Sequence, residues 1–259
     1  LIKSSSINDL VPQLVNFYKT FAVEKDIEVI HQSIVNKLSY FNSLDTDSKR
    51  RKYFSYIKKS FNNLWSNENR NTSKHRKEPD FLNKSESKKS TVLLYVLNRT
   101  CFNGLFRVNS KGGFNVPFGD HKNPKICHSE NLRNVSSVLQ NTTIMRGDYS
   151  KSEDFIDENT FVYFDPPYRP LTTSSSFTAY SKSGFNDNDQ IKLADYVKLI
   201  SNKTNFMLSN SDPNNNGTVD DFFDVLYSDF TITRIMAPRA INSDGEGRGK
   251  ISEILVTNY

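Results

Sequence analysis

Residues 165–168 read Asp-Pro-Pro-Tyr and place an acid and an aromatic ring on either side of two rigid residues. They follow the apolar run 161–164, whose aromatic and β-branched side chains predict a buried strand. The prolines should end that strand, because neither can donate a backbone hydrogen bond to a sheet. The sequence therefore predicts a stiff turn at the carboxyl end of a strand, where open α/β sheets bind ligands.

This turn contains the groups that methylation of an exocyclic amine on a nucleobase would require. Such an amine is a poor nucleophile, because its lone pair is delocalised into the ring. The carboxylate of Asp165 and the carbonyl of Pro166 could accept its two N–H bonds and stabilise the positive charge that develops on nitrogen. Pro167 stiffens the turn, and the ring of Tyr168 could stack on a base that has left its duplex. The alternative is an ordinary turn that caps a strand.

The turn resembles motif IV of the DNA adenine-N6 methyltransferases, and three other segments resemble the Dam-like group of that family. Residues 97–119 resemble its DNA-reading segment, residues 168–185 its loop after motif IV, and residues 239–259 its closing segment. The reader precedes motif IV, which is the order of the α class. The resemblance implies methyl transfer from S-adenosylmethionine to a flipped adenine, with duplex GATC as the dominant target. Cytosine-N4 methylation is a less favoured alternative, because those enzymes usually carry Ser where Asp165 stands.

The resemblance also implies the fold class. We expect an α/β protein: a Rossmann-like S-adenosylmethionine-dependent methyltransferase domain with an inserted, mostly helical target-recognition domain that carries a β-hairpin. The catalytic domain would comprise residues 1–22 and 141–259, and the target-recognition domain residues 23–140.

Three positions resemble the family's cofactor-binding residues besides Asp165. Asp9 resembles the acid at a strand end that binds the ribose of S-adenosylmethionine, and Asp148 and Tyr149 resemble residues that flank the cofactor's adenine. The family's glycine-rich cofactor loop precedes the Asp9 strand and is not found, and the glycines at 245–249 are expected to form a loop. We therefore expect the chain to lack its amino-terminal segment. The alternative function is a truncated remnant that binds GATC without cofactor binding or catalysis.

Five residues resemble the family's DNA contacts. Arg107 would donate two hydrogen bonds to a guanine, the commonest specific contact in the major groove, although a surface arginine can also pair with an acid. Phe102 would insert into the base stack as the adenine leaves. Asn103 would either hydrogen-bond the orphaned thymine or brace the hairpin. Leu105 and Pro117 would make apolar contacts with bases and thymine methyl groups.

Composition adds broad limits. The 259 residues are 36% hydrophobic, and the net charge of +5 fits a polyanionic partner, here double-stranded DNA. Cys101 and Cys127 give no disulfide framework, and no spacing suggests a metal site. Basic residues gather over 49–59 and 74–77, either as solvated helix faces or as phosphate contacts. With no membrane-spanning stretch or signal peptide visible, we expect a soluble, cytoplasmic monomer. Whether a cognate restriction endonuclease accompanies it stays open.

Periodicity and turn signals predict the supporting elements. Residues 10–21 have helical spacing with Asp9 placed to cap them, and Asp187 with Gln190 predicts a second capped helix. Asn210 either shapes the pocket wall or forms a turn. Further expectations are helices over 27–38, 54–64, 91–98 and 130–140 and after Thr218 and Asp221, a loop over 66–89, a hairpin over 102–118 turning at 110–113, and strands over 144–149, 206–208, 230–236 and 251–257.

Overall fold

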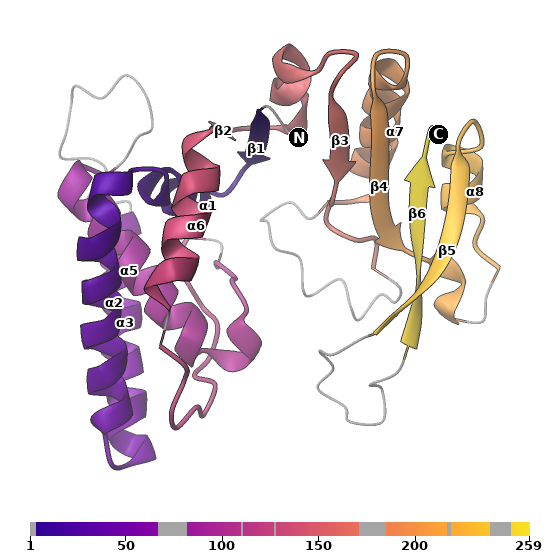
Figure 1. Cartoon of the computed structure of the whole chain (residues 1–259). Coiled ribbons are helices and arrows are strands. Elements are labelled where there is room, and N and C mark those ends of the chain that lie inside the picture. The colour runs from indigo at the N-terminus through magenta and orange to yellow at the C-terminus, as the bar shows by residue number, and fades with distance from the viewer. Residues whose placement is uncertain are drawn as a thin grey trace. The chain divides into compact units, whose positions relative to one another are not determined.

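The computed structural model divides into two compact units, an amino-terminal unit (residues 1–151) and a carboxy-terminal unit (residues 152–259), each treated by itself (Figure 1). The expected division into a catalytic domain and a target-recognition domain is a division by function. The two compact units do not test it, and it stays a prediction. The structure describes residues 4–66, 82–109, 111–126, 128–170, 185–216, 219–238 and 250–259.

Several predicted features lie outside these described residues, and the structure does not bear on them. They are residues 67–81 of the expected loop, Ser110 of the hairpin turn, Cys127, residues 171–184 after motif IV, the capping residue Thr218, and residues 239–249 with their glycines.

In the amino-terminal unit, the two strands that pair with each other come before and after a run of helices in the chain. In its described ranges β1 (Ser5–Asp9) pairs in parallel with β2 (Thr142–Arg146), with Ser5 opposite Thr142. Parallel strands need a long crossover connection, and here the whole helical run supplies it. That run consists of α1 (Pro12–Phe21), η1 (Glu24–Asp26), α2 (Ile27–Ser43), α3 (Asp47–Trp65), α5 (Lys84–Thr100), η2 (Phe102–Gly104) and α6 (Ser129–Gln140).

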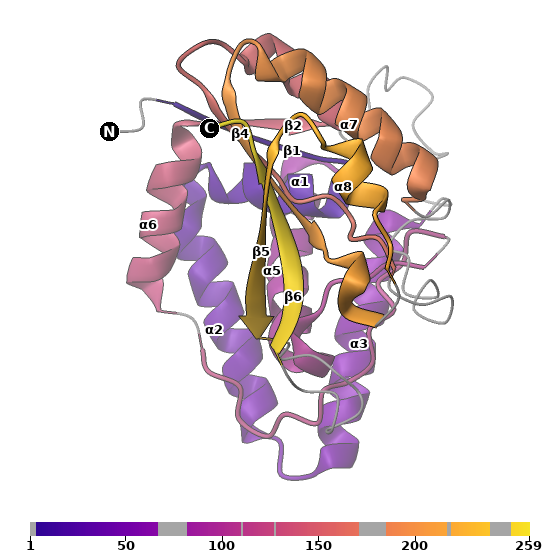
Figure 2. The ribbon, with the colours of Figure 1, turned by 90° about the vertical axis from the view of Figure 1, so that its right-hand side faces the viewer.

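Helix α5 forms the centre of the helical core. It contacts α1, α2 and α3, while α6 packs beside α2 (Figures 1 and 2). The apolar stripes predicted from three- and four-residue spacing are buried, as Ile34 and Leu38 of α2 illustrate, each with 0% exposure. Most of the second half of α5 is buried, including every residue from Ser90 to Leu94, which explains why that segment is apolar on more than one face.

Helix α5 begins earlier than its apolar residues predict. It starts at Lys84 instead of Thr91, because Asn83 and Glu86 form a reciprocal cap. The Asn83 side chain accepts the Glu86 N–H at 3.0 Å, and the Glu86 carboxylate accepts the Asn83 N–H at 2.9 Å. The predicted loop over 66–89 is therefore wrong at its carboxyl end, where a polar cap starts the helix before any apolar periodicity appears.

The carboxy-terminal unit is built on a mixed sheet. In its described ranges the strand order is β3-β4-β6-β5. β3 (Phe161–Phe164) and β4 (Asn205–Ser211) are parallel, whereas β6 (Lys250–Thr257) is antiparallel to both β4 and β5 (Thr231–Pro238). The predicted strands are confirmed with small shifts in their ends. The other elements are α7 (Asp187–Ser201), η5 (Pro213–Asn216) and α8 (Phe222–Leu226), while η3 (Tyr149–Phe155) spans the boundary between the two units in the chain.

Strand β3 is less buried than its apolar composition predicts. Phe164 is buried, but the side chains of Phe161 and Tyr163 are 55% and 56% exposed. Within the described residues β3 is an edge strand that pairs with β4 alone, and alternate side chains of a strand point to opposite faces. The prediction of a strand is confirmed, and the prediction of full burial is wrong.

Two predicted helix caps differ in detail. α1 starts at Pro12 and not at Leu10, and Asp9 does not cap it; instead the Asp9 carboxylate accepts the Val11 N–H at 2.7 Å. Proline favours a first helical turn, because its missing N–H has no partner there in any helix. At α7, Asn186 with Asp189 forms the reciprocal cap that was predicted for the residues one position later.

Candidate functional site

Residues 165–168 leave β3 at its carboxyl end, so the predicted strand-to-turn geometry is confirmed. Asp165 and Tyr168 are exposed, and Pro166 is partly buried. Within the described residues, the Pro166 carbonyl accepts no hydrogen bond from the protein. The acid, this carbonyl and the ring are therefore open to a ligand.

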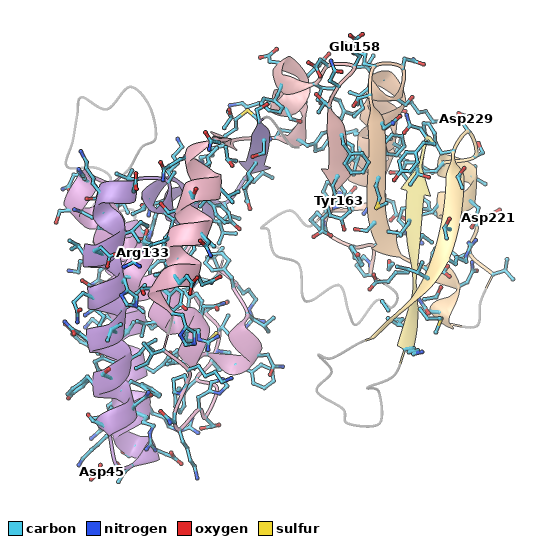
Figure 3. All side chains as sticks on the ribbon, in the orientation of Figure 1. Asp45, Arg133, Glu158, Tyr163, Asp221 and Asp229 are labelled. Atoms are coloured by element: carbon cyan, nitrogen blue, oxygen red, sulfur yellow. The ribbon has the colours of Figure 1, made fainter. Side chains whose placement is uncertain are left out.

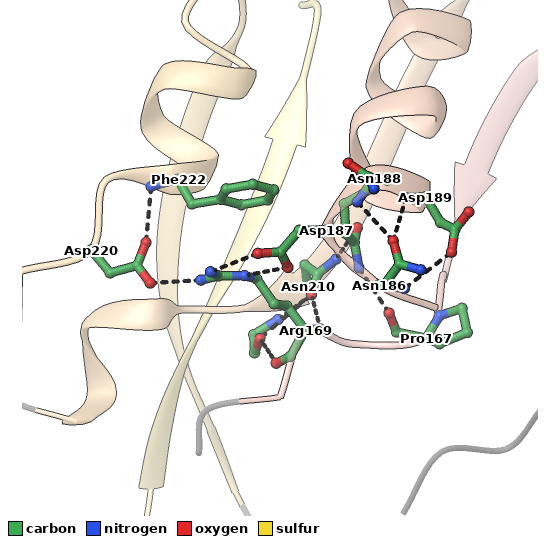
Figure 4. A network of polar contacts seen from close by, with 11 residues as sticks. Pro167, Arg169, Asn186, Asp187, Asn188, Asp189, Asn210, Asp220 and Phe222 are labelled. Atoms are coloured by element: carbon green, nitrogen blue, oxygen red, sulfur yellow. Dashed lines mark hydrogen bonds and ion pairs between the residues drawn. The ribbon is translucent and has the colours of Figure 1, made fainter. Parts of the chain in front are cut away.

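Buried polar side chains of α7 and β4 form hydrogen bonds with the backbone of the turn and of the residue that follows it (Figure 4). Gln190 donates to the Pro167 carbonyl at 3.0 Å, and the Asn210 side-chain oxygen accepts the Arg169 N–H at 3.0 Å. Gln190 and Asn210 are themselves joined at 3.2 Å, and both are 0% exposed. Ser211 donates to the Arg169 carbonyl at 2.7 Å. Buried polar groups that are fully paired make a rigid support.

Asn210 thus lies inside β4 and is buried, so its alternative interpretation as a turn residue is wrong. Its side chain bonds to the backbone of Arg169, the residue that directly follows the Asp-Pro-Pro-Tyr segment. Gln190 was singled out only as a helix-capping residue, and its contact with Pro167 was not foreseen. Neither residue stood out in the sequence as a support for the turn, because other polar residues flank Gln190 in α7 and Asn210 in β4.

The side chain of Arg169 joins this turn to two other segments (Figure 4). Its guanidinium contacts the Asp187 carboxylate through two nitrogens, at 2.9 and 3.1 Å, and Asp220 at 2.6 Å. It also lies 4.4 Å over the Phe222 ring. The hydrogen bond that Arg169 donates to Asp187 raises the pKa of Arg169, against the effect of burial, and the bond that Arg169 donates to Asp220 lowers the pKa of Asp220. This arginine is therefore an intramolecular anchor.

Asp165 and Tyr168 have protein contacts of their own. The Ser209 hydroxyl donates to Asp165 Oδ1 at 3.3 Å and lies 3.0 Å from the Tyr163 hydroxyl. Tyr168 donates to Glu253 Oε2 at 3.4 Å. Burial raises the pKa of the Tyr168 phenol above its ordinary value. The phenol stays uncharged at neutral pH, which suits stacking on a base.

The predicted cofactor residues of the amino-terminal unit lie at adjacent strand ends. Asp9 ends β1, and Asp148 and Tyr149 follow β2. The Asn8 side chain donates to the Asp148 carbonyl at 2.7 Å, and the Gly147 N–H bonds to the Asp9 carbonyl at 3.2 Å. Burial raises the pKa of Asp9, and the Val11 N–H lowers it. Asp165 belongs to the carboxy-terminal unit, and within the amino-terminal unit the fold brings Asp9 and Asp148 to adjacent strand ends.

The segment predicted to read DNA is a loose antiparallel loop. Its described residues form two isolated bridges, Cys101 with Phe118 and Val108 with Phe114, in place of the regular ribbon that was predicted. The first arm cannot extend straight, because residues 102–104 form a 3₁₀ turn. The predicted positive φ is found at Gly112, with a value of 78°.

The candidate DNA-contacting side chains are mostly accessible. Phe102 is 44% exposed, and Asn103 and Pro117 are exposed, whereas Leu105 and Arg107 are partly buried. Asn103 has a φ of 52°, a left-handed conformation that asparagine tolerates better than most residues. Arg107 donates through Nε to the Asn115 side chain at 2.9 Å, and within the described residues it has no carboxylate partner. Its terminal nitrogens therefore face no acid of the described chain.

Side chains from α1 and α3 fix the backbone of this loop. Asn62 accepts the Phe114 N–H at 2.8 Å and donates to the Phe114 carbonyl at 3.1 Å. Gln13 donates to the Gly112 carbonyl at 2.9 Å. Burial, together with the nearby charge of Arg107, lowers the pKa of Lys58. The loop is therefore held on a helical base that carries more than one cation.

Comparison with known proteins places this arrangement in a family. Residues 2–241 match the family described as D12 class N6 adenine-specific DNA methyltransferase. The chain belongs to this family. The expectation of an adenine-specific DNA methyltransferase is thereby confirmed, and with it the mixed α/β class, whereas cytosine-N4 methylation is contradicted. Methyltransferases of this kind generally use S-adenosylmethionine, and the substrate of the family is DNA.

Individual relatives support the assignment over most of the chain. The type II methyltransferase M.MjaIII of Methanocaldococcus jannaschii is 40% identical over 259 residues, which is 99% of this methyltransferase and 81% of the relative. M1.LlaDCHI of Lactococcus lactis subsp. cremoris is 44% identical over 178 residues, 68% of this chain and 60% of its own. A DNA adenine methylase of Vibrio cholerae is 29% identical over 249 residues, 95% and 77% of the two chains. No helix in the described ranges is long and apolar enough to cross a membrane.

Proposed function

We propose that this methyltransferase modifies the N6 amine of an adenine flipped out of duplex GATC, with Asp165, Pro166, Pro167 and Tyr168 as its catalytic turn. The observation that carries the proposal is the contrast between the two sides of that turn. Buried Gln190 bonds to its backbone at Pro167, and buried Asn210 bonds to the backbone of the next residue, Arg169, while Asp165 and Tyr168 stay exposed. A rigid backbone that presents free acceptors is what positioning of a weak nucleophile requires.

The proposed roles follow from the chemistry of the amine. Asp165 accepts one N–H and the Pro166 carbonyl accepts the other, so the nitrogen lone pair is directed out of the plane of the base. Both acceptors stabilise the positive charge that forms on nitrogen, and Tyr168 holds the ring by stacking. Pro167 restricts the backbone, and its carbonyl is occupied by Gln190. The proton leaves after transfer, so no separate base is required.

We infer that Asp9, Asp148 and Tyr149, together with Asp165, hold S-adenosylmethionine, whose sulfonium supplies an electrophilic methyl group when it is bound. The neighbouring ends of β1 and β2 support this inference. A carboxylate such as Asp9 can accept hydrogen bonds from ribose hydroxyls, and Tyr149 offers a flat face to an adenine. The residues present fit these parts of the cofactor.

Recognition of GATC is assigned to Phe102, Asn103, Leu105, Arg107 and Pro117 within a target-recognition domain of residues 23–140. Accessibility of the first two and the helical anchoring of the loop support this assignment. We further infer that the enzyme acts on DNA as a monomer.

The experiment measures the transfer of labelled methyl groups to a duplex with one GATC site. The comparison is a duplex in which the adenines of that site, one on each strand, are replaced. Asp165→Ala should abolish transfer and leave DNA affinity within about threefold, because the acid acts after binding. Normal turnover by this variant would refute the mechanism. Label appearing equally in both duplexes would refute the target. Isothermal titration with S-adenosylmethionine separates an enzyme from a remnant that only binds DNA.

A further inference from the structure

A buried hydroxyl on β4 contacts the proposed catalytic turn directly. Ser209 is 2% exposed and donates to Asp165 Oδ1 at 3.3 Å. The parallel register explains the contact: Phe164 is opposite Leu208, so the next step along both strands brings Asp165 level with Ser209. The hydroxyl also lies 3.0 Å from the hydroxyl of Tyr163, which is on β3.

The direction of these hydrogen bonds follows from counting protons. An ionised carboxylate can only accept, so the single hydroxyl proton of Ser209 must go to Asp165. The Ser209 oxygen must then accept from Tyr163, because it has no second proton to give. The result is a chain in which Tyr163 donates to Ser209 and Ser209 donates to Asp165. It occupies one carboxylate oxygen of Asp165 and leaves the other for a ligand.

The hydroxyl of Tyr168, the second exposed member of the turn, donates its own proton to Glu253 Oε2 at 3.4 Å. A serine hydroxyl commonly bonds to a nearby backbone carbonyl, as the partly buried Ser201 does with Lys198 of its own helix. Ser209 instead makes its contacts to side chains on β3 and on the turn that follows it.

We propose that Ser209 is a positioning residue for methyl transfer, which fixes the rotamer of Asp165 so that its second oxygen faces the target amine. Tyr163 in turn orients Ser209. This inference rests on the proposed role of Asp165 and adds to it, since Ser209 touches neither the adenine nor the methyl group.

Single-turnover methylation of a one-site duplex tests the proposal. Ser209→Ala should lower the rate constant about ten- to hundredfold, because a small misplacement of a reacting group costs that much. The reaction amplitude and the dissociation constant for DNA should stay unchanged. A merely structural role would lower the amplitude, since part of the protein would be inactive. Ser209→Thr, which keeps the hydroxyl, should recover most of the rate.

A second variant keeps the test valid if Ser209→Ala folds poorly. Tyr163→Phe changes a half-exposed side chain and should lower the rate about two- to fivefold, the effect of one lost hydrogen bond. In the Ser209→Ala background it should have no further effect, because both act through one chain of contacts. Ser201→Ala is the matched control and should behave as wild type.

Two results would overturn the proposal. One is a wild-type rate constant in Ser209→Ala when Asp165→Ala is inactive. The other is an equal effect of Tyr163→Phe in both backgrounds. Activity of Asp165→Ala itself would instead refute the proposed function, so the two failures are distinguishable.

Discussion

Two arginines of this methyltransferase differ in their bonding: Arg169 is paired within the protein, whereas Arg107 is a candidate contact to DNA. Arg169, despite its charge and its position next to Tyr168, is bonded to two carboxylates and covered by an aromatic ring. Arg107 is bonded only through Nε within the described residues, to an amide. Its two terminal nitrogens can therefore form the paired hydrogen bonds that a guanine edge accepts.

Replacement of Arg107 should change specificity more than affinity. Arg107→Ala should relax the requirement for one guanine of GATC about ten- to hundredfold, which corresponds to about 1–3 kcal/mol for a bidentate contact. The measurement is kcat/KM on duplexes altered one base pair at a time. Asn115→Ala, which removes only the orienting partner, should show a smaller relaxation at the same base pair. An unchanged preference profile in Arg107→Ala would place the guanine contact elsewhere.

At the scale of elements, the candidate active turn depends on connections between α7, β4 and the segment before α8. The turn itself has no regular structure, so its shape comes from the side chains beneath it (Figure 4). Two sets of bonds contribute. Gln190, Asn210 and Ser211 bond to the backbone of Pro167 and Arg169. The Arg169 guanidinium forms ion pairs with Asp187 and Asp220.

Removal of the Arg169 charge should therefore destabilise the carboxy-terminal unit. Arg169→Gln leaves Asp187 and Asp220 without their partner and should lower the free energy of unfolding by about 1–3 kcal/mol, since the guanidinium is largely buried. Denaturant titration would measure the loss. Lys192→Gln is a suitable control, because its ion pair with Asp189 is exposed and should contribute about 0–1 kcal/mol. Equal losses in both variants would contradict the anchoring role.

A second group of contacts makes the same unit sensitive to acid. Burial alone would raise the pKa of Asp212, but hydrogen bonds from Ser252 and Asn214 and the charge of Arg234 bring it below the ordinary value of 3.8. A lowered pKa in the folded state stabilises the protein above 3.8 and ceases to do so as pH falls through the folded-state value.

Thermal unfolding followed between pH 6 and pH 3 should show this loss. Asp212→Asn should be less stable than wild type at pH 6 and should lose less stability on acidification. Parallel curves for the two proteins would show that Asp212 does not contribute. These pH values run from about two units above the ordinary carboxyl pKa to about one unit below it.

At the scale of the whole molecule, the net charge of +5 matters for binding to DNA but does not identify the contacts. Side chains of every type cover both units (Figure 3), and many cations are already paired. Lys49 bonds to Asp45 and Arg51 to Asp120, whereas Lys52 is exposed on α3 and has no ion pair within the described residues.

The dependence of DNA affinity on salt should distinguish these lysines. If Lys52 contacts a phosphate, Lys52→Ala should weaken binding to all sequences alike and reduce the slope of log K against log salt by about 1. Lys49→Ala, whose charge is already paired, should change the slope less. A slope that is the same in wild type and Lys52→Ala would exclude this lysine from the phosphate contacts.

The sequence by itself determined the local features. A strand that ends in Asp-Pro-Pro-Tyr, the amphipathic helices and most strands could be predicted, because periodicity and proline chemistry act between near neighbours. Family membership was likewise visible in the order of short segments. Cap positions shifted by one or two residues, because several polar side chains near a helix start compete for the same N–H groups.

The tertiary structure alone decided what surrounds the turn. Ser209, Gln190 and Asn210 lie more than twenty residues from Asp165 in the chain, and only the pairing of β3 with β4 and the packing of α7 bring them to it. The exposure of β3 and the loose bridges of the reading loop were equally unpredictable, because both depend on which neighbours a strand finds. Local propensity selects an element, whereas its partners and its buried face are selected by contacts distant in sequence.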